Sequence, residues 1–173
     1  MRIINKTLSN DRPIIVTYDN DDDGQRIVSK ICDEDYNQKL ITFFKIPQEP
    51  RVRYKSGHIG GSFEEIFDYN YFIDCCFMSN IMDIELVQEK DSFFKIFDAQ
   101  KPWFQQVQKF CAEHNYYKFN EKKLSIAENL AIYCDKLPST VKELRDLIYE
   151  VRDNNPVIHP DDVELPKIPG LTC

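Results

Sequence analysis

An acidic stretch, DNDDDG at residues 19–24, has the residue types of a cation-binding loop. EF-hand calcium loops place oxygen ligands at positions 1, 3 and 5 and a glycine at position 6. The chain matches these four positions with Asp19, Asp21, Asp23 and Gly24. Position 12, which should supply a bidentate glutamate, is instead Lys30. Because Asn, Asp and Gly are also the ordinary residues of exposed turns, we expect no metal and no other cofactor.

Histidine and cysteine residues could support two further kinds of chemistry, thiol catalysis and zinc binding. His58 precedes Cys75 and Cys76, but a nucleophilic thiolate needs a partnered base and an oxyanion hole, and the sequence fixes neither. Cys111 and His114 are three residues apart, a spacing that can supply half of a zinc site, and no second half is recognisable. We therefore expect structural cysteines in the core and no catalytic residues.

The composition predicts a single soluble globular domain. The chain has 173 residues, of which 42% are hydrophobic and 29% charged, which is ordinary for a protein with a real core. A formal charge of −7 argues against general nucleic-acid binding, which depends on neutralising phosphates. The six cysteines form no CxxC pair, polar residues interrupt the amino terminus, and no run of about 18 apolar residues occurs. These features favour reduced thiols, no signal peptide, no membrane span and a cytoplasmic or nuclear location.

The amino-terminal half has mainly the patterns of strands. We expect strands at residues 2–8, 12–18, 40–46 and 51–56, with a helix at residues 25–34. Residues 9–11 would join the first two strands in a hairpin. The basic side chains of Arg51, Arg53 and Lys55 alternate along the last strand. They are typical of the exposed face of an edge strand, although they could also contact a phosphate or an acidic partner.

The glycine-rich segment at residues 57–62 contains three of the five glycines in the chain. We interpret it as a flexible connection and a possible internal boundary. Ser62 and Glu65 then form a capping box, which predicts a helix start. Residues 69–88 are ambiguous, because their β-branched and aromatic residues favour a strand near residues 71–77 while the later part could be helical.

Three short amphipathic helices are predicted in the carboxy-terminal half. The first follows Pro102, and the others begin at the capping boxes Ser125/Glu128 and Thr140/Glu143. Their apolar stripes are Phe104, Val107 and Cys111; Ile126, Leu130 and Cys134; and Val141, Leu144, Leu147, Ile148 and Val151. Helices this short must bury their stripes to be stable. The expected fold is α+β, with a β-rich amino-terminal half packed on a carboxy-terminal bundle of short amphipathic helices, forming one domain over residues 1–153.

Residues 154–173 are predicted to form an extended proline-rich tail. Prolines at positions 156, 160, 166 and 169 are incompatible with a regular helix. The apolar residues among them are too many for a solvated terminus and favour docking into a groove, on this domain or on a partner. The tail residues with this expected role are Val157, Ile158, Leu165 and Ile168.

The order of elements in residues 93–153 resembles the carboxy-terminal half of a BTB/POZ domain, the family of elongin C and the adaptor subunit of SCF ubiquitin ligases. That pattern is a short strand, a helix ending in an aromatic-rich stretch, and two helices around a phrase matched here by residues 129–137. The resemblance implies a protein–protein adaptor without catalytic residues. A shorter resemblance, of residues 141–170 to the second half of a lysin-motif module, would imply a secreted glycan binder.

The leading hypothesis is an intracellular, non-catalytic interaction module that binds a protein partner, or a second copy of itself, through its helical half and its tail. Trp and Tyr are the typical anchors of interfaces, so Trp103, Tyr116 and Tyr117 are the expected contacts of the helical half. One alternative is an acidic viral, phage or bacterial inhibitor or effector that masks a basic site on its target. Another is an enzyme that uses His58 with Cys75 or Cys76.

Overall fold

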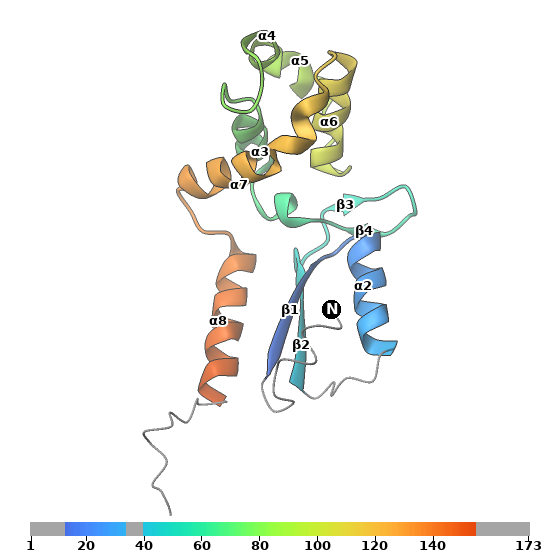
Figure 1. Ribbon diagram of the computed structural model, residues 1–173, viewed down its shortest axis with the longest axis vertical. Coiled ribbons are helices and arrows are strands. Elements are labelled where there is room, and N and C mark those ends of the chain that lie inside the picture. The colour runs from blue at the N-terminus through green and yellow to red at the C-terminus, as the bar shows by residue number, and fades with distance from the viewer. Residues whose placement is uncertain (1–12, 34–39, 155–173) are drawn as a thin grey trace, which may run out of the picture.

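The computed structural model of the chain describes residues 13–33 and 40–154 (Figure 1). Apart from α2, which lies between β1 and β2, the strands come first and the helices follow, which confirms the α+β class predicted from the sequence. The strands are β1 (Ile14–Asp19), β2 (Ile41–Ile46), β3 (Val52–Arg53) and β4 (Ile59–Gly60). The helices are α2 (Asp22–Asp33), α3 (Tyr69–Cys76), α4 (Ile84–Gln88), α5 (Lys90–Phe94), α6 (Trp103–Glu113), α7 (Lys123–Ile132) and α8 (Ser139–Asn154), with 3₁₀ segments η2 (Phe63–Ile66) and η3 (Tyr117–Lys122). The strand expected at residues 2–8 and the tail beyond residue 154 lie outside the described residues.

β1 and β2 form a parallel pair, with α2 as the crossover between them. The register runs from Ile14 opposite Ile41 to Asp19 opposite Ile46. Both strands were predicted to within two residues. The helix, expected from residue 25, begins earlier, so its first turn lies directly against the end of β1. A Cβ on Gly24 would stand 1.8 Å from the carbonyl oxygen of Asp19, which explains the glycine at this position.

The glycine-rich segment is part of a short hairpin and is not a flexible connection, so this expectation was wrong. β3 and β4 pair antiparallel, and the N–H of Gly61 donates to the carbonyl oxygen of Asn20 at 2.8 Å. A Cβ on Gly60 would lie 1.7 Å from the same oxygen. The glycines therefore allow close packing of the hairpin against the end of β1. On the other hairpin strand, Val52 is 1% exposed and Arg53 faces solvent, as expected for an edge.

The hydrophobic core lies among the helices from η2 to α7, above the sheet in Figure 1. Its fully buried side chains include Phe72, Ile73, Cys75, Cys76, Phe93, Val107, Cys111, Phe119 and Leu130. The ambiguous segment contains α3, where the sequence favoured a strand. The helix is favoured over a strand for two reasons. Asp68 caps its amino terminus, where Oδ1 accepts the N–H of Asn70 at 2.9 Å, and the helix directs its apolar side chains into one core.

Of the three predicted capping boxes, only that of Ser62 and Glu65 forms. Glu65 Oε2 accepts the Ser62 N–H at 2.6 Å and the Ser62 hydroxyl at 2.7 Å, at the start of η2. The other two were wrong because their helices begin earlier, so that Ser125 and Thr140 lie inside α7 and α8. Backbone hydrogen bonds set these starts, and at α8 the carbonyl of Pro138 is the first acceptor.

The apolar stripe of α8 is only half-buried, which corrects the prediction of a buried stripe. Thr140 is the one buried residue of this helix, and Val141 packs at the edge of the core. Beyond this first turn α8 leaves the helical core and extends below it in Figure 1, at the same height as β1 and β2. Ile148 and Tyr149 are 47% and 48% exposed, while Leu144 and Leu147 are partly exposed.

Candidate partner-binding surface

Helix α7 has apolar side chains on the side that faces solvent as well as on the side that faces the core. Its outer face carries Leu124, Ala127, Ala131 and Ile132, all exposed, with the exposed Glu128 between Leu124 and Ile132. Leu124 and Ile132 are each 72% exposed, whereas Leu130 on the opposite face is 2% exposed. Exposed apolar side chains that gather on one side of a helix mark a candidate interaction site. The outer face of α7 is therefore the best-defined candidate for covering by another protein.

Polar contacts fix the inner face of α7 and thereby the direction of its outer face. Asn129, only 4% exposed, donates through Nδ2 to the carbonyl of Cys75 at 3.1 Å, and its Oδ1 accepts from Asn80 at 3.0 Å. The hydroxyl of Tyr71 donates to the carbonyl of Leu130 at 2.6 Å. Because these bonds join α7 to α3 and to the loop after it, the outer face is held on a rigid support.

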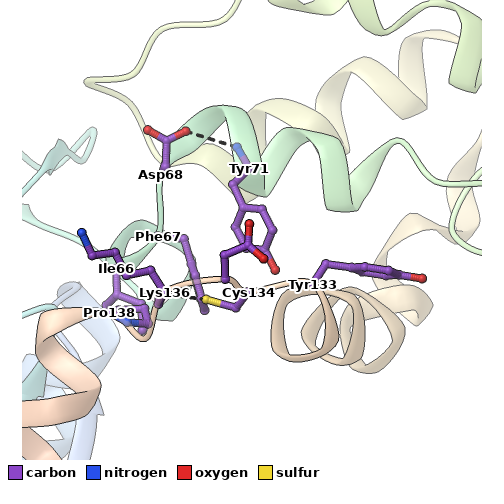
Figure 2. A pocket seen from close by; sticks show the side chains of 9 residues that line it. Ile66, Phe67, Asp68, Tyr71, Tyr133, Cys134, Lys136 and Pro138 are labelled. Carbon is purple, nitrogen blue, oxygen red and sulfur yellow. Dashed lines mark hydrogen bonds between the residues drawn. The ribbon is translucent and has the colours of Figure 1, made fainter.

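A pocket of about 240 Å³ lies next to α7, where η2 and the start of α3 meet the link between α7 and α8 (Figure 2). Its lining residues are Ile66, Phe67, Asp68, Tyr71, Tyr133, Cys134, Asp135, Lys136 and Pro138. Ile66 and Phe67 are buried, and Tyr133 at the rim is 55% exposed. Cys134 Sγ donates to the carbonyl of Lys136 at 3.0 Å and so shapes the link. This combination of apolar and charged lining suits an apolar side chain flanked by charges.

The three aromatic residues predicted as contacts lie in different environments. Trp103 is 3% exposed, and its ring packs against Phe72 with centroids 5.9 Å apart, so its expected role at an interface was wrong. Tyr116 is half-buried, and its hydroxyl donates to the carbonyl of Ile81 at 2.6 Å. Tyr117 is 72% exposed and remains available to a partner. The tail residues Val157, Ile158, Leu165 and Ile168 lie outside the described residues.

The acidic stretch is used to begin a helix and does not form a calcium loop. Asp21 Oδ1 accepts the N–H of Gly24 at 2.7 Å and so caps α2, while Asp23 pairs with Arg26 at 2.8 Å. Burial, with the nearby charges of Glu64 and Asp21, raises the pKa of Asp19. Within residues 13–33 and 40–154, no group of three or more His, Cys, Asp or Glu side chains could hold a metal ion.

Calcium at about 1 mM is expected to leave the melting temperature unchanged, because a loop of this kind without its bidentate ligand binds weakly. Asp21→Ala should lower the free energy of unfolding by about 1 kcal/mol through loss of the helix cap, with or without calcium. Thermal melts of both proteins, with magnesium as the control cation, test this. A rise of several degrees with calcium that Asp21→Ala abolishes would contradict it.

The thiols and histidines do not form the sites considered from the sequence. Cys75 and Cys76 are fully buried, and burial raises the pKa of both thiols, which opposes thiolate formation. His58 Nε2 lies 3.1 Å from the carbonyl oxygen of Asn20, and its ring stacks on Tyr54. Likewise, burial raises the pKa of the Cys111 thiol to about 12, and His114 is exposed with Nδ1 2.9 Å from the carbonyl of Phe110.

The outer face of α7 and the pocket were missed by sequence reasoning. The available signal was the apolar residues of α7 outside its Ile126–Leu130 stripe, namely Leu124, Ala131 and Ile132. Comparisons with protein-family models, curated proteins and solved structures find no match for this chain. Among the described helices, none combines the length and the apolar character needed to cross a membrane.

Proposed function

We propose that this chain is a non-catalytic protein–protein interaction module of the cytoplasm or nucleus, a BTB-like adaptor or a functional equivalent. The observation that carries the proposal is the exposed apolar outer face of α7 on its rigid support. The succession of α6, η3, α7 and α8 supports the BTB-like part of the proposal. In place of the short strand that begins the BTB pattern, the chain has α5.

The energetic argument concerns Leu124 and Ile132. Fully burying a side chain of this size contributes about 1.5–3 kcal/mol, and both are 72% exposed in the isolated chain. A partner that covers them would gain enough to offset part of the cost of association. Exposed apolar side chains that gather on one surface mark interaction sites in many proteins.

The test is the double substitution Leu124→Asp with Ile132→Asp in the full chain, with Ile84→Asp as the matched control. Ile84 is 67% exposed on α4, far from α7 in Figure 1. All three positions face solvent, so melting temperatures should change little. We expect the double variant to lose at least tenfold in partner capture from native cells or in self-association by sedimentation, and the control to behave as wild type.

A second candidate function is the acidic inhibitor that masks a basic site, which the charge of −7 favours. Salt separates the two functions, because apolar contacts persist between low and high ionic strength whereas acidic mimicry weakens steeply. Binding that resists salt and depends on Leu124 and Ile132 supports the module. Binding that salt abolishes and the double variant retains would replace it with the inhibitor.

A further inference from the structure

The pocket lies beside the start of α8, whose apolar stripe is only half-buried. Pro138, which lines the pocket, directly precedes the helix, so the pocket lies at the amino-terminal end of α8. Along the helix, Leu144, Leu147, Ile148 and Tyr149 remain partly or largely exposed. A chain segment that followed α8 from its end to its start would therefore meet exposed apolar side chains and then the pocket, whose lining is apolar and charged.

We propose that the occupant of the pocket and of the exposed side of α8 is the chain's own carboxy-terminal segment, residues 155–173, running back along α8 with its end in the pocket. The inference does not depend on the proposed function, since it uses neither the outer face of α7 nor any partner. It assigns a binding site for a specified peptide within the same molecule.

Chain length supports this assignment. The 16 residues of α8 span about 24 Å at about 1.5 Å per residue. An extended chain of about 3.3 Å per residue covers that distance in about seven residues. Starting after Asn154, the segment would bring Val157 and Ile158 level with Leu147 and Ile148. It would bring Val163, Leu165 and Ile168 to the pocket.

Charge complementarity supports the same direction of the segment, from the end of α8 towards its start. Asp161, Asp162 and Glu164 would pass the exposed amino groups of Lys142 and Lys136, near the start of α8. Further along, Lys167 would reach the pocket rim, where Asp68 and Asp135 supply the opposite charge. The apolar residues and both signs of charge thus match in one alignment. The four prolines favour the extended conformation that this path requires.

The test uses the two cysteines that this docking would bring together, Cys134 in the pocket and Cys173 at the end of the chain. The full-length protein is treated with a short bifunctional thiol cross-linker at low concentration, and the linked peptides are identified by mass spectrometry. Cys32, exposed on α2, is the internal comparison, and the paired variant Leu165→Asp with Ile168→Asp should release the segment. Asn155→Asp is the matched control, because it adds a charge to the tail outside its apolar positions.

We expect the Cys134–Cys173 link to form within single molecules at several times the yield of the Cys32–Cys173 link, and the paired variant to lower its yield about tenfold. Asn155→Asp should leave the yield unchanged. Equal yields of the two links, or a yield that the paired variant does not alter, would overturn the proposal. A Cys134–Cys173 link found only between two molecules would overturn it too, in favour of a second copy as the occupant.

Discussion

Glu65→Ala is expected to lower the free energy of unfolding by about 3–4 kcal/mol, one of the two largest effects predicted for this chain. Glu65 is fully buried, and its carboxylate accepts three hydrogen bonds. Two come from Ser62, and the third comes from the N–H of Trp103, to Oε1 at 2.9 Å. Alanine would leave these donors without an acceptor and would release η2 from the start of α6. Chemical denaturation of both proteins measures the loss, and a difference below about 1 kcal/mol would contradict this role.

The pH dependence of stability gives a separate check on the same carboxyl group. Burial raises the pKa of Glu65, and the hydrogen bonds from Trp103 and Ser62 only partly oppose this. A carboxyl whose pKa is higher in the folded state binds more protons when folded, so its contribution to stability falls as pH rises from the usual glutamate pKa to the raised value. Glu65→Gln, which keeps one acceptor oxygen and cannot ionise, should lack this fall. A stability difference between Glu65→Gln and wild type that is constant across the window would exclude the assignment.

Trp103→Ala is the second large effect, and we expect a loss of about 3–5 kcal/mol. The indole ring contacts Phe72 and Phe97, and its Nε1 donates to the carbonyl of Ala99 at 3.0 Å. The substitution leaves a cavity in the core and a carbonyl without its partner.

Tyr117→Ala is the matched control for Trp103→Ala, since both residues were expected to be interface anchors from the sequence. Its side chain is 72% exposed, so the change should stay within about 0.5 kcal/mol. Thermal melts of the two variants compare the loss of stability at the buried Trp103 with that at the exposed Tyr117. A small effect of Trp103→Ala would mean that the ring is available at the surface after all.

The sequence predicted the types of the elements better than it predicted how they pair and pack. The apolar runs of β1 and β2 mark strands, because apolar residues occupy both faces: Ile14 and Val16 lie on one face of β1 and Ile15 on the other. Their parallel pairing requires the crossover that α2 provides, and the Asp-rich start of that helix resembles a loop. The segment at residues 57–62 looks flexible by composition, and only the approach of Gly60 to Asn20 and of Gly61 to Pro47 shows why glycine is needed there.

The candidate surface was harder to predict, because burial depends on the tertiary arrangement. Trp103 and Tyr117 have the same expected role from residue type alone, but Trp103 begins α6 inside the core, where Glu65 accepts its N–H, and Tyr117 lies exposed in η3. Leu144 and Leu147 have ideal spacing for a buried face. Periodicity does not reveal that α8 leaves the core after its first turn.

Chemical modification of the buried thiols would report how often the helical core opens. Cys75, Cys76 and Cys111 are fully shielded from solvent, and their thiols are held in the unreactive protonated form by burial. Oxidants and alkylating agents can therefore reach them only in molecules whose helical core has transiently separated. The rate at which a reagent modifies these three positions would report the frequency of that separation. Under oxidative stress, molecules that had opened would carry oxidised cysteines at these positions, and the sulfinic and sulfonic forms would persist.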